Sequence, residues 1–326
     1  MRLVFFGSDA IALPALEYLL WAEGVELAGV VSQPDRPAGR GRHLHKNAVS
    51  AWAVAKGVPL LQPEKPGSEE AEWLRYQRVD LALVMAYGHI LRQSLLESVP
   101  HWMWNLHASL LPAFRGASPV ESAIVSGAKE TGVSLMRMVK KMDAGPVVGV
   151  EKVAILGSDT GPTLRARLAH ACVPLLQRHL AGLGTAAVRP VEQNGALATY
   201  TRKLTKQDGQ VDFTAPAAEV ERRVRALAAW PGVAFEHGGQ AIKIGAAAVV
   251  AEADSAAAGT VLRAGTTGLD VATGAGVLRL LTLQRPGGRM MEVGEFLRGY
   301  PLAAGEILPS RPMAPLISPQ PFPRVG

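Results

Sequence analysis

An asparagine and a histidine two residues apart end an apolar run in the first third of the chain. Asn105 and His107 lie in the segment WMWNLHASLLPAFRGASP, residues 102–119. Side chains two apart on a strand share a face, and open α/β sheets bind their ligands at the carboxyl ends of strands. An amide and an imidazole that converge there can hydrogen-bond an oxygen that gains charge during acyl transfer. Taken alone, the pair fits such a site and fits a strand end with an incidental Asn and His equally well.

A carboxylate in a second segment could complete this site. Asp143 stands in MDAGP, residues 142–146. Asp-Ala-Gly is an ordinary hairpin turn, and a turn beside the strand end could also aim the carboxylate at His107. The two interpretations are compatible. Ser109 lies in a loop and has no base of its own, so the sequence predicts no covalent nucleophile.

The elements that must position these residues alternate between strands and helices. Strands are predicted at 2–6, 25–31, 79–86 and 102–106, with amphipathic helices between them. This alternation is typical of a parallel sheet covered by helices on both faces. An antiparallel hairpin formed by residues 134–138 and 147–155, and a long helix over about 160–183, would complete the first domain.

The pattern changes beyond residue 183. Residues 184–207 lose periodicity and are predicted to be a linker. A helix in AAEVERRVRALA and short alternating strands between Gly turns then predict a small antiparallel β-barrel over 208–310. The last segment, 311–326, is rich in proline, and we expect it to be disordered at its end.

The charge of the chain is basic and evenly spread. The formal net charge of the 326 residues is +6, with a sequence pI near 9.6, which favours a polyanionic partner. From Thr201 onward there are 14 basic and 11 acidic side chains, and before it 20 and 17. Each part therefore carries +3, and charge alone marks neither domain as the one that binds.

Cysteine use and hydropathy limit the possible compartments. Cys172, the one cysteine, lies in an apolar helical run, so we expect a buried structural thiol and a reducing cytoplasm. No stretch approaches the length of a membrane span. Gly7, Asp9 and Glu17 interrupt the apolar N-terminal run, which argues against a signal peptide. The sequence predicts a cytoplasmic protein, and we expect a monomer.

Three common ligand classes find no support. The stretch FFGSDAIA holds only Gly7 where a dinucleotide-binding turn needs three glycines, and no ATP-binding Walker sequence is present. His43 and His45 lack a third ligand nearby and are interpreted as solvated loop residues. We therefore expect no NAD, no ATP and no metal.

The segments NLHASLLPAFRGASP and MDAGP together resemble the signature of the 10-formyltetrahydrofolate-dependent formyltransferases. In that family an Asn, a His and an Asp surround a Ser-Leu-Leu-Pro loop. The resemblance implies that Asn105 and His107 stabilise an oxyanion, that Asp143 orients His107, and that 10-formyltetrahydrofolate is the co-substrate. The folate-binding residues that it implies are Val84, Met85, Ala86, Tyr87, Gly88, Ser109, Leu110, Leu111 and Pro112.

The resemblance narrows to one subfamily. VSQPDRPAGRGRHL (31–44) is similar to a loop of the methionyl-tRNA formyltransferases, and YTRKLTK (200–206) also resembles them. The match runs in order from residue 2 to about 300. It implies that the α-amine of the methionine carried by initiator methionyl-tRNA attacks the formyl carbon directly, and that the product is used in translation initiation. The tRNA-binding residues that it implies are Arg36, Arg40, Arg42, Lys203, Lys206 and Arg289.

The expected fold is α/β, a Rossmann-like parallel-sheet formyltransferase domain (1–183) joined by the linker to a barrel that resembles the oligonucleotide-binding folds. Two departures from the subfamily bear on RNA binding: Ala113 and Gly288 stand where a basic residue is common, although Arg115 lies two residues after Ala113.

The alternative functions are those of a sugar-nucleotide N-formyltransferase, a formyl-folate hydrolase, and a tRNA-binding protein without catalysis. The basic loop and the barrel argue against the first two, and the intact Asn-His-Asp set argues against the third.

Overall fold

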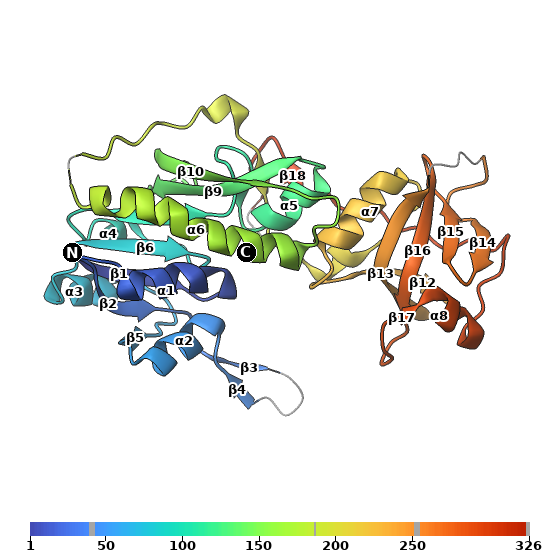
Figure 1. Cartoon of the computed structure of the whole chain (residues 1–326), viewed down its shortest axis with the longest axis horizontal. Helices are drawn as coiled ribbons and strands as arrows, with labels where there is room; N and C mark the ends of the chain where they lie inside the picture. The colour runs from blue at the N-terminus through green and yellow to red at the C-terminus, as the bar shows by residue number, and fades with distance from the viewer. Residues whose placement is uncertain (39–42, 186, 251–254, 324–326) are drawn as a thin grey trace. The chain divides into compact units, whose positions relative to one another are not determined.

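A seven-stranded sheet forms the centre of the N-terminal part of the chain (Figure 1). The computed structural model describes residues 1–38, 43–185, 187–250 and 255–323. The sheet has the order β10-β9-β7-β6-β1-β2-β5. Its strands are β1 (Arg2–Gly7), β2 (Glu26–Val31), β5 (Leu60–Leu61), β6 (Leu81–Met85), β7 (Met103–His107), β9 (Glu130–Arg137) and β10 (Val147–Ala154).

Strand direction agrees with the sequence prediction. The five strands from β7 to β5 in this order are parallel, and β9 and β10 join them antiparallel, as the expected hairpin. Every residue of β6 is buried, which is the burial of a strand covered on both faces. The covering and connecting elements are η1 (Ala10–Ala12), α1 (Leu13–Trp21), α2 (Ala48–Lys56), α3 (Ser68–Tyr76), α4 (Gln93–Leu96) and α6 (Gly161–Leu183).

Local signals explain where these helices begin and end. The Asn47 side chain accepts hydrogen bonds from the backbone N–H groups of Val49 and Ser50, and so caps α2. Gly57 ends the same helix with φ 69°, a left-handed conformation that glycine adopts without strain. Cys172 is buried in α6, and burial raises the pKa of its thiol to about 12. The predicted structural role of this cysteine fits that environment.

A short antiparallel hairpin leaves the sheet after β2. It consists of β3 (Arg36–Ala38) and β4 (His43–His45), and it projects beside α2 (Figure 1). The part of the basic loop that contains Arg40 and Arg42 lies outside the described residues. The described strands β3 and β4 precede and follow that part of the loop in the chain.

The chain forms two units that interleave in sequence. One comprises Met1–Gly116, Glu130–Ala154 and Arg165–Tyr200, and the other Ala117–Lys129, Ile155–Leu164 and Thr201–Gly326. The second unit thus takes a helix, α5 (Pro119–Val125), from the middle of the stretch predicted to be the first domain. Val120 and Ile124 of α5 are buried, and the Nε of Arg222 donates a hydrogen bond to the carbonyl of Val125. Packing of α5 on α7 explains why this helix belongs with the C-terminal residues.

An antiparallel sheet with the order β12-β13-β16-β15-β14 organises the second unit, and β17 pairs with β16. From Thr201 onward, the elements of the second unit are η3 (Lys206–Gly209), α7 (Ala217–Ala226), β12 (Val233–His237), β13 (Gln240–Val250), β14 (Val261–Gly265), β15 (Gly268–Ala272), β16 (Val277–Gln284), β17 (Met291–Glu292), α8 (Val293–Gly299) and β18 (Ile317–Ser318). The predicted antiparallel architecture is confirmed.

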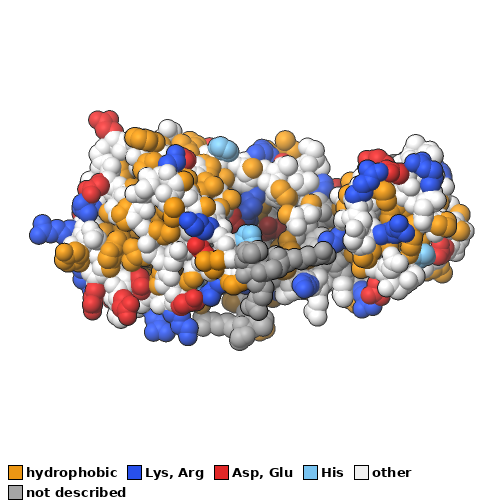
Figure 2. All heavy atoms as spheres, turned by 90° about the horizontal axis from the view of Figure 1, so that it is seen from below, with side chains coloured by type: hydrophobic (Ala, Val, Ile, Leu, Met, Phe, Trp, Pro, Cys, Tyr) orange, Lys and Arg blue, Asp and Glu red, His pale blue; other side chains and the backbone are white. Residues whose placement is uncertain are grey.

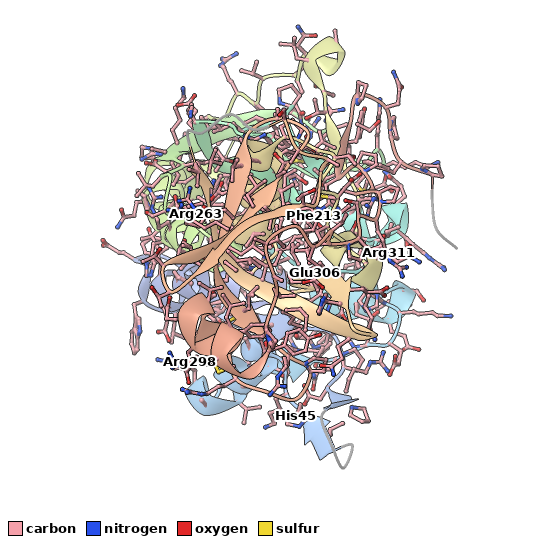
Figure 3. The ribbon with its side chains drawn as sticks, turned by 90° about the vertical axis from the view of Figure 1, so that its right-hand side faces the viewer. His45, Phe213, Arg263, Arg298, Glu306 and Arg311 are labelled. Carbon is pink, nitrogen blue, oxygen red and sulfur yellow. The ribbon has the colours of Figure 1, made fainter. Side chains whose placement is uncertain are left out.

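The two end strands of this sheet do not pair with each other in the described ranges; each is covered by a passing segment instead. Val261 of β14 donates its N–H to the carbonyl of Glu306, and Leu308 donates to Gly259. A single bridge joins Gln210 to Ala234 of β12. Covered edges leave fewer free backbone groups for unwanted pairing with another chain. Figure 3 views this unit from its end, with Glu306 among the labelled residues.

The structure describes the Pro-rich tail over residues 311–323, and the end of the tail, for which we expect disorder, lies outside the described residues. Both terminal guanidinium nitrogens of Arg223 donate to the carbonyl of Ala314, at 3.1 Å, and the Nε of Arg202 donates to Pro315. Leu316 is buried. Proline removes backbone donors but leaves carbonyls, so a Pro-rich strand can be held by arginines from elsewhere in the unit. Residues 324–326 lie outside the described part.

We expect Leu316→Ala to lower the free energy of unfolding by about 2–4 kcal/mol, because it empties a buried leucine site. Leu197→Ala, at an exposed leucine of η2 (Gly195–Leu197), should change it by less than about 0.5 kcal/mol. Urea unfolding of both variants measures the difference. Equal, small effects would mean that the tail does not pack in solution.

Candidate functional site

Asn105 and His107 occupy alternate positions at the end of β7. Asn105 lies opposite Val84 of β6 and Met136 of β9, and His107 lies opposite Ser134. Their spacing puts the two side chains on one face of the strand, as the sequence predicts. His107 is buried and Asn105 is half-buried. Within the described chain the Asn105 amide has no hydrogen-bond partner, which leaves it available to a ligand.

The imidazole of His107 has a defined tautomer. Its Nε2 lies 3.0 Å from the carbonyl oxygen of Phe114, and a carbonyl can only accept, so Nε2 carries a hydrogen. The other nitrogen, Nδ1, lies 3.9 Å from Oδ2 of Asp143, beyond hydrogen-bond distance but close enough for charge attraction. Nδ1 is therefore the ring nitrogen that faces the carboxylate of Asp143.

The turn that carries Asp143 is strained and tightly packed. Asp143 has φ 49°, in the left-handed region that residues other than glycine seldom adopt. Its Oδ2 accepts a hydrogen bond of 2.8 Å from the N–H of Gly116. A Cβ on Gly145 would lie 1.8 Å from the carbonyl oxygen of Arg137, so only glycine fits there. The Asp-Ala-Gly sequence forms a turn and also directs the carboxylate to His107, so both interpretations of it hold.

Gln193 holds this turn and the loop after β7 together. Its Nε2 donates to the carbonyls of Asp143 and Gly145, at 2.9 and 2.7 Å. Its Oε1 accepts from Nε and Nη2 of Arg115, at 3.1 and 2.7 Å. The two ends of one amide thus connect the two segments that meet at His107. Residue 193 falls in the stretch predicted to be a linker, and no local pattern marks it.

The loop after β7 is anchored by a second residue of that stretch. Thr199 accepts from the N–H of Phe114 through its hydroxyl and from the N–H of Arg115 through its carbonyl, both at 2.8 Å. Arg115 is only 2% exposed, and its guanidinium lies over the ring of Tyr200. The charge of Arg115 is therefore buried in the protein, whereas position 113 carries no charge.

The predicted folate residues of the Ser-Leu-Leu-Pro loop have unequal access. Ser109 is fully buried, and its hydroxyl donates to the carbonyl of Ala113 at 2.6 Å. The hydroxyl of Ser134 donates to the carbonyl of Ser109 and accepts from the N–H of Leu111. Ser109 is thus a structural residue of the loop. Leu110, Leu111 and Pro112 are half-buried and can border a ligand.

The predicted folate residues after β6 present mainly their backbone. Val84, Met85 and Tyr87 have buried side chains, whereas Ala86 and Gly88 are exposed and have positive φ values of 48° and 82°. A ligand at this turn would meet backbone groups of 86–88. The Tyr87 hydroxyl has no hydrogen-bond partner within the described residues, and burial raises its pKa.

The cations predicted to bind tRNA differ in their partners. Arg36 forms an ion pair with Glu64, and Arg289 forms one with Glu295, whereas Lys203 and Lys206 are exposed. Figure 2 shows Lys and Arg side chains interspersed with Asp and Glu on the face that it presents. Lys203 and Lys206 are thus the described cations of the predicted set that remain without an ion-pair partner.

The described residues contain no group of three or more His, Cys, Asp or Glu side chains placed to hold a metal ion. None of their helices is both long enough and apolar enough to cross a membrane.

Comparison with known proteins gives matches along most of the chain. Residues 1–180 match the family described as formyl transferase, and residues 203–301 match the formyl transferase C-terminal domain. The chain is 41% identical over 305 residues to a methionyl-tRNA formyltransferase of Halorhodospira halophila, covering 94% of this chain and 98% of that protein. A methionyl-tRNA formyltransferase of Sorangium cellulosum is 40% identical over 311 residues, covering 94% and 99%.

Solved structures share the fold at low identity. An N-formyltransferase from Helicobacter canadensis, in complex with folinic acid and dTDP-3-aminofucose, superposes with a TM-score of 0.66 at 16% identity, covering 87% of this chain and 99% of that one. HypX from Aquifex aeolicus, in complex with tetrahydrofolic acid, gives 0.61 at 17%, covering 95% and 51%. These likenesses confirm the predicted fold.

We expect Gln193→Ala to destabilise the protein by about 1–3 kcal/mol, because it removes an acceptor from buried Arg115 and a donor from the 143–145 turn. Glu192→Ala, at the exposed neighbouring position, should cost less than about 0.5 kcal/mol. Urea unfolding compares them. Indistinguishable stabilities would show that the Gln193 contacts are not formed in solution.

Proposed function

We propose, from the premise that this chain belongs to the formyltransferase family, that it transfers the formyl group of 10-formyltetrahydrofolate to the α-amino group of methionine on initiator methionyl-tRNA. The observation that carries the proposal is the identity of about 41% with methionyl-tRNA formyltransferases over nearly the whole chain. The product serves translation initiation.

The second family match separates this reaction from the alternatives. Residues 203–301 match the formyl transferase C-terminal domain, and the matches to the relatives at 40–41% identity cover 94% of this chain. The sugar N-formyltransferases resemble this chain at 14–16% identity, which supports a common fold alone. A tRNA substrate is therefore favoured over a sugar nucleotide.

The chemistry requires stabilisation of charge and one proton transfer. The α-amino nitrogen bonds to the formyl carbon, the bond from that carbon to N10 of the folate breaks, and the proton lost by the amine is passed to N10. We assign stabilisation of the oxyanion to the Asn105 amide and to His107. Because Nε2 of His107 is bonded to Phe114, the donor available to the substrate is Nδ1–H of the imidazolium.

Asp143 has two roles in this proposal. Its carboxylate, 3.9 Å from Nδ1, balances the charge of the imidazolium and orients the ring. It can also relay the amine proton through a water molecule. The bond from Gly116 and the Gln193 contacts keep the carboxylate on the side of His107. No covalent intermediate with the protein is needed.

The folate is proposed to lie along the turn 86–88 and beside Leu110–Pro112. A pterin ring has several hydrogen-bond donors and acceptors on one edge, which suits exposed backbone groups between apolar side chains. Val84, Met85 and Tyr87 would support that turn from the core, and Ser109 would shape the loop. Ala86 and Gly88 are exposed to solvent, which supports access of a ligand to this turn.

Basic side chains are proposed to bind the tRNA substrate. We propose that Arg36, Arg40 and Arg42 approach the acceptor end of the tRNA, and that Lys203, Lys206 and Arg289 contact its phosphates. The enzyme would act as a monomer in the cytoplasm, where initiator tRNA is charged and used. Sedimentation of the pure protein measures the first of these two properties.

Replacing Asn105, His107 or Asp143 by Ala should lower kcat about a hundredfold or more, because each loses a group that acts on the developing charge. The Kd for initiator tRNA should change less than about threefold. His170→Ala, at an exposed histidine of α6, should keep full activity. The roles assigned to these residues would be wrong if Asn105→Ala kept nearly full turnover with saturating substrates.

The contribution of the C-terminal unit to tRNA binding is best measured in the full chain. A chain ended near Lys203 would lose α7, on which α5 packs, so weak tRNA binding could reflect unfolding. The double variant Lys203→Gln/Lys206→Gln keeps that packing. It should weaken tRNA binding about tenfold and reduce the slope of log Kd against log salt by about 2, because two phosphate contacts are lost.

Lys152→Gln, at an exposed lysine of β10 paired with Glu130, is the matched control and should change neither quantity. Binding of tetrahydrofolate should be equal in all three proteins. An unchanged salt slope in the double variant would exclude these two lysines from the RNA contact.

A further inference from the structure

Gln33 is a hub of hydrogen bonds between β2 and the β3–β4 hairpin. Its N–H donates to the hydroxyl of Ser8, after β1, at 3.0 Å. Its carbonyl accepts from the side-chain amides of Asn47 and Gln62, both at 2.9 Å. Backbone groups of Gln33 therefore tie the ends of β1 and β5 and the start of α2 to one point.

The side chain of Gln33 points in a different direction, to the turn after β6. Its Nε2 donates to the carbonyl of Tyr87 at 2.8 Å. A Cβ on Gly88 would lie 2.3 Å from the same Nε2, so the turn accepts this amide only because residue 88 is glycine. The Ser8 hydroxyl donates to the same carbonyl at 3.2 Å and gives the turn a second support.

The root of the hairpin is bound to the same network. Oδ1 of Asp35 accepts from the hydroxyl of Ser50 at 2.7 Å and from Nε2 of Gln62 at 2.9 Å. Burial alone would raise the pKa of Asp35, but the bonds from Ser50 and Gln62 bring it below its usual value, so the carboxylate stays ionised. Gln62 bonds both Asp35 and Gln33, so the hairpin root and the hub are held by one amide.

These contacts form a continuous path between two surfaces. The hairpin carries Arg36, which is proposed to approach the tRNA, and the turn 86–88 is proposed to bind the folate. Each step of the path is a direct hydrogen bond within one unit of the fold. Gln33 therefore stands between the hairpin root and the turn 86–88.

We propose that Gln33 is a positioning residue that couples the two substrate sites, so that tRNA bound at the hairpin strengthens folate binding at the turn 86–88. The inference rests on the proposed function, because it needs both substrates. Gln33 itself touches neither substrate in this proposal. Its side chain transmits the position of the hairpin root to the Tyr87 carbonyl, while its backbone bonds maintain the fold.

The test measures coupling rather than activity. Tetrahydrofolate, which has no formyl group to transfer, is titrated into the protein with and without saturating initiator methionyl-tRNA. The ratio of the two Kd values is the coupling factor, which we expect to be at least about fivefold for the parent protein. The tRNA affinity must change by the same factor when tetrahydrofolate is present, and this reciprocity checks the measurement.

Gln33→Ala should bring the coupling factor within about twofold of 1, while each ligand alone binds within about threefold of the parent value. Gln33→Glu keeps the volume of the side chain but cannot donate a hydrogen bond to the Tyr87 carbonyl, so we expect it to lose the coupling as well. If the Ala variant fails to fold, the coupling factor of the Glu variant tests the proposal. Gln93→Ala, at an exposed glutamine bonded to Glu97, should keep the full coupling.

The outcomes separate this inference from the proposed function. A parent protein that cannot formylate initiator methionyl-tRNA refutes the function. An active parent with a coupling factor of 1, or a folded Gln33 variant that keeps the parent factor, refutes the coupling and leaves the function standing. Loss of coupling in both Gln33 variants, with Gln93→Ala unchanged, supports it.

Discussion

A parallel sheet buried on both faces imposes the constraint from which the rest of this structure follows. β1 and β6 have almost no exposed side chain, so polar chemistry along these strands is confined to their ends. Ser8 and the turn 86–88 follow these two strands directly, and Gln33 follows β2. Asn105 and His107 lie in β7 at the same kind of position. The candidate substrate surfaces are therefore neighbours because the strands that precede them are neighbours in the sheet.

The sheet ends place these groups, but distant segments hold them. The loop after β7 is held from a distant segment, because Thr199 binds its backbone and Gln193 binds Arg115. The same Gln193 amide fixes the strained turn of Asp143. Preorganised groups are effective because the cost of ordering them has been met in folding rather than in the reaction. The residues between the two family matches thus contribute order to the site.

RNA binding faces a different physical problem, since long-range attraction needs unpaired charge. Part of the basic charge described is enclosed within the protein, since Arg115 and Arg223 are each only 2% exposed. A net charge of +6, spread evenly over the sequence, leaves a modest excess for a partner. Exposed lysines such as Lys203 and Lys206 are therefore better candidates for phosphate contacts than the arginines that stabilise the fold.

The sequence by itself determined the alternation of strands and helices, the shared face of Asn105 and His107, and the family, because periodicity and motifs are local properties of the chain. It also indicated the turn at Asp143. Only the tertiary structure decided that Gln193 and Thr199 support the site, that Arg115 is buried, that α5 belongs with the C-terminal unit, and that Pro-rich residues 311–323 are ordered. Each of these depends on partners far away along the chain. A single glutamine or a proline-rich strand has no period of its own, so its role exists only once folding has brought its partner beside it.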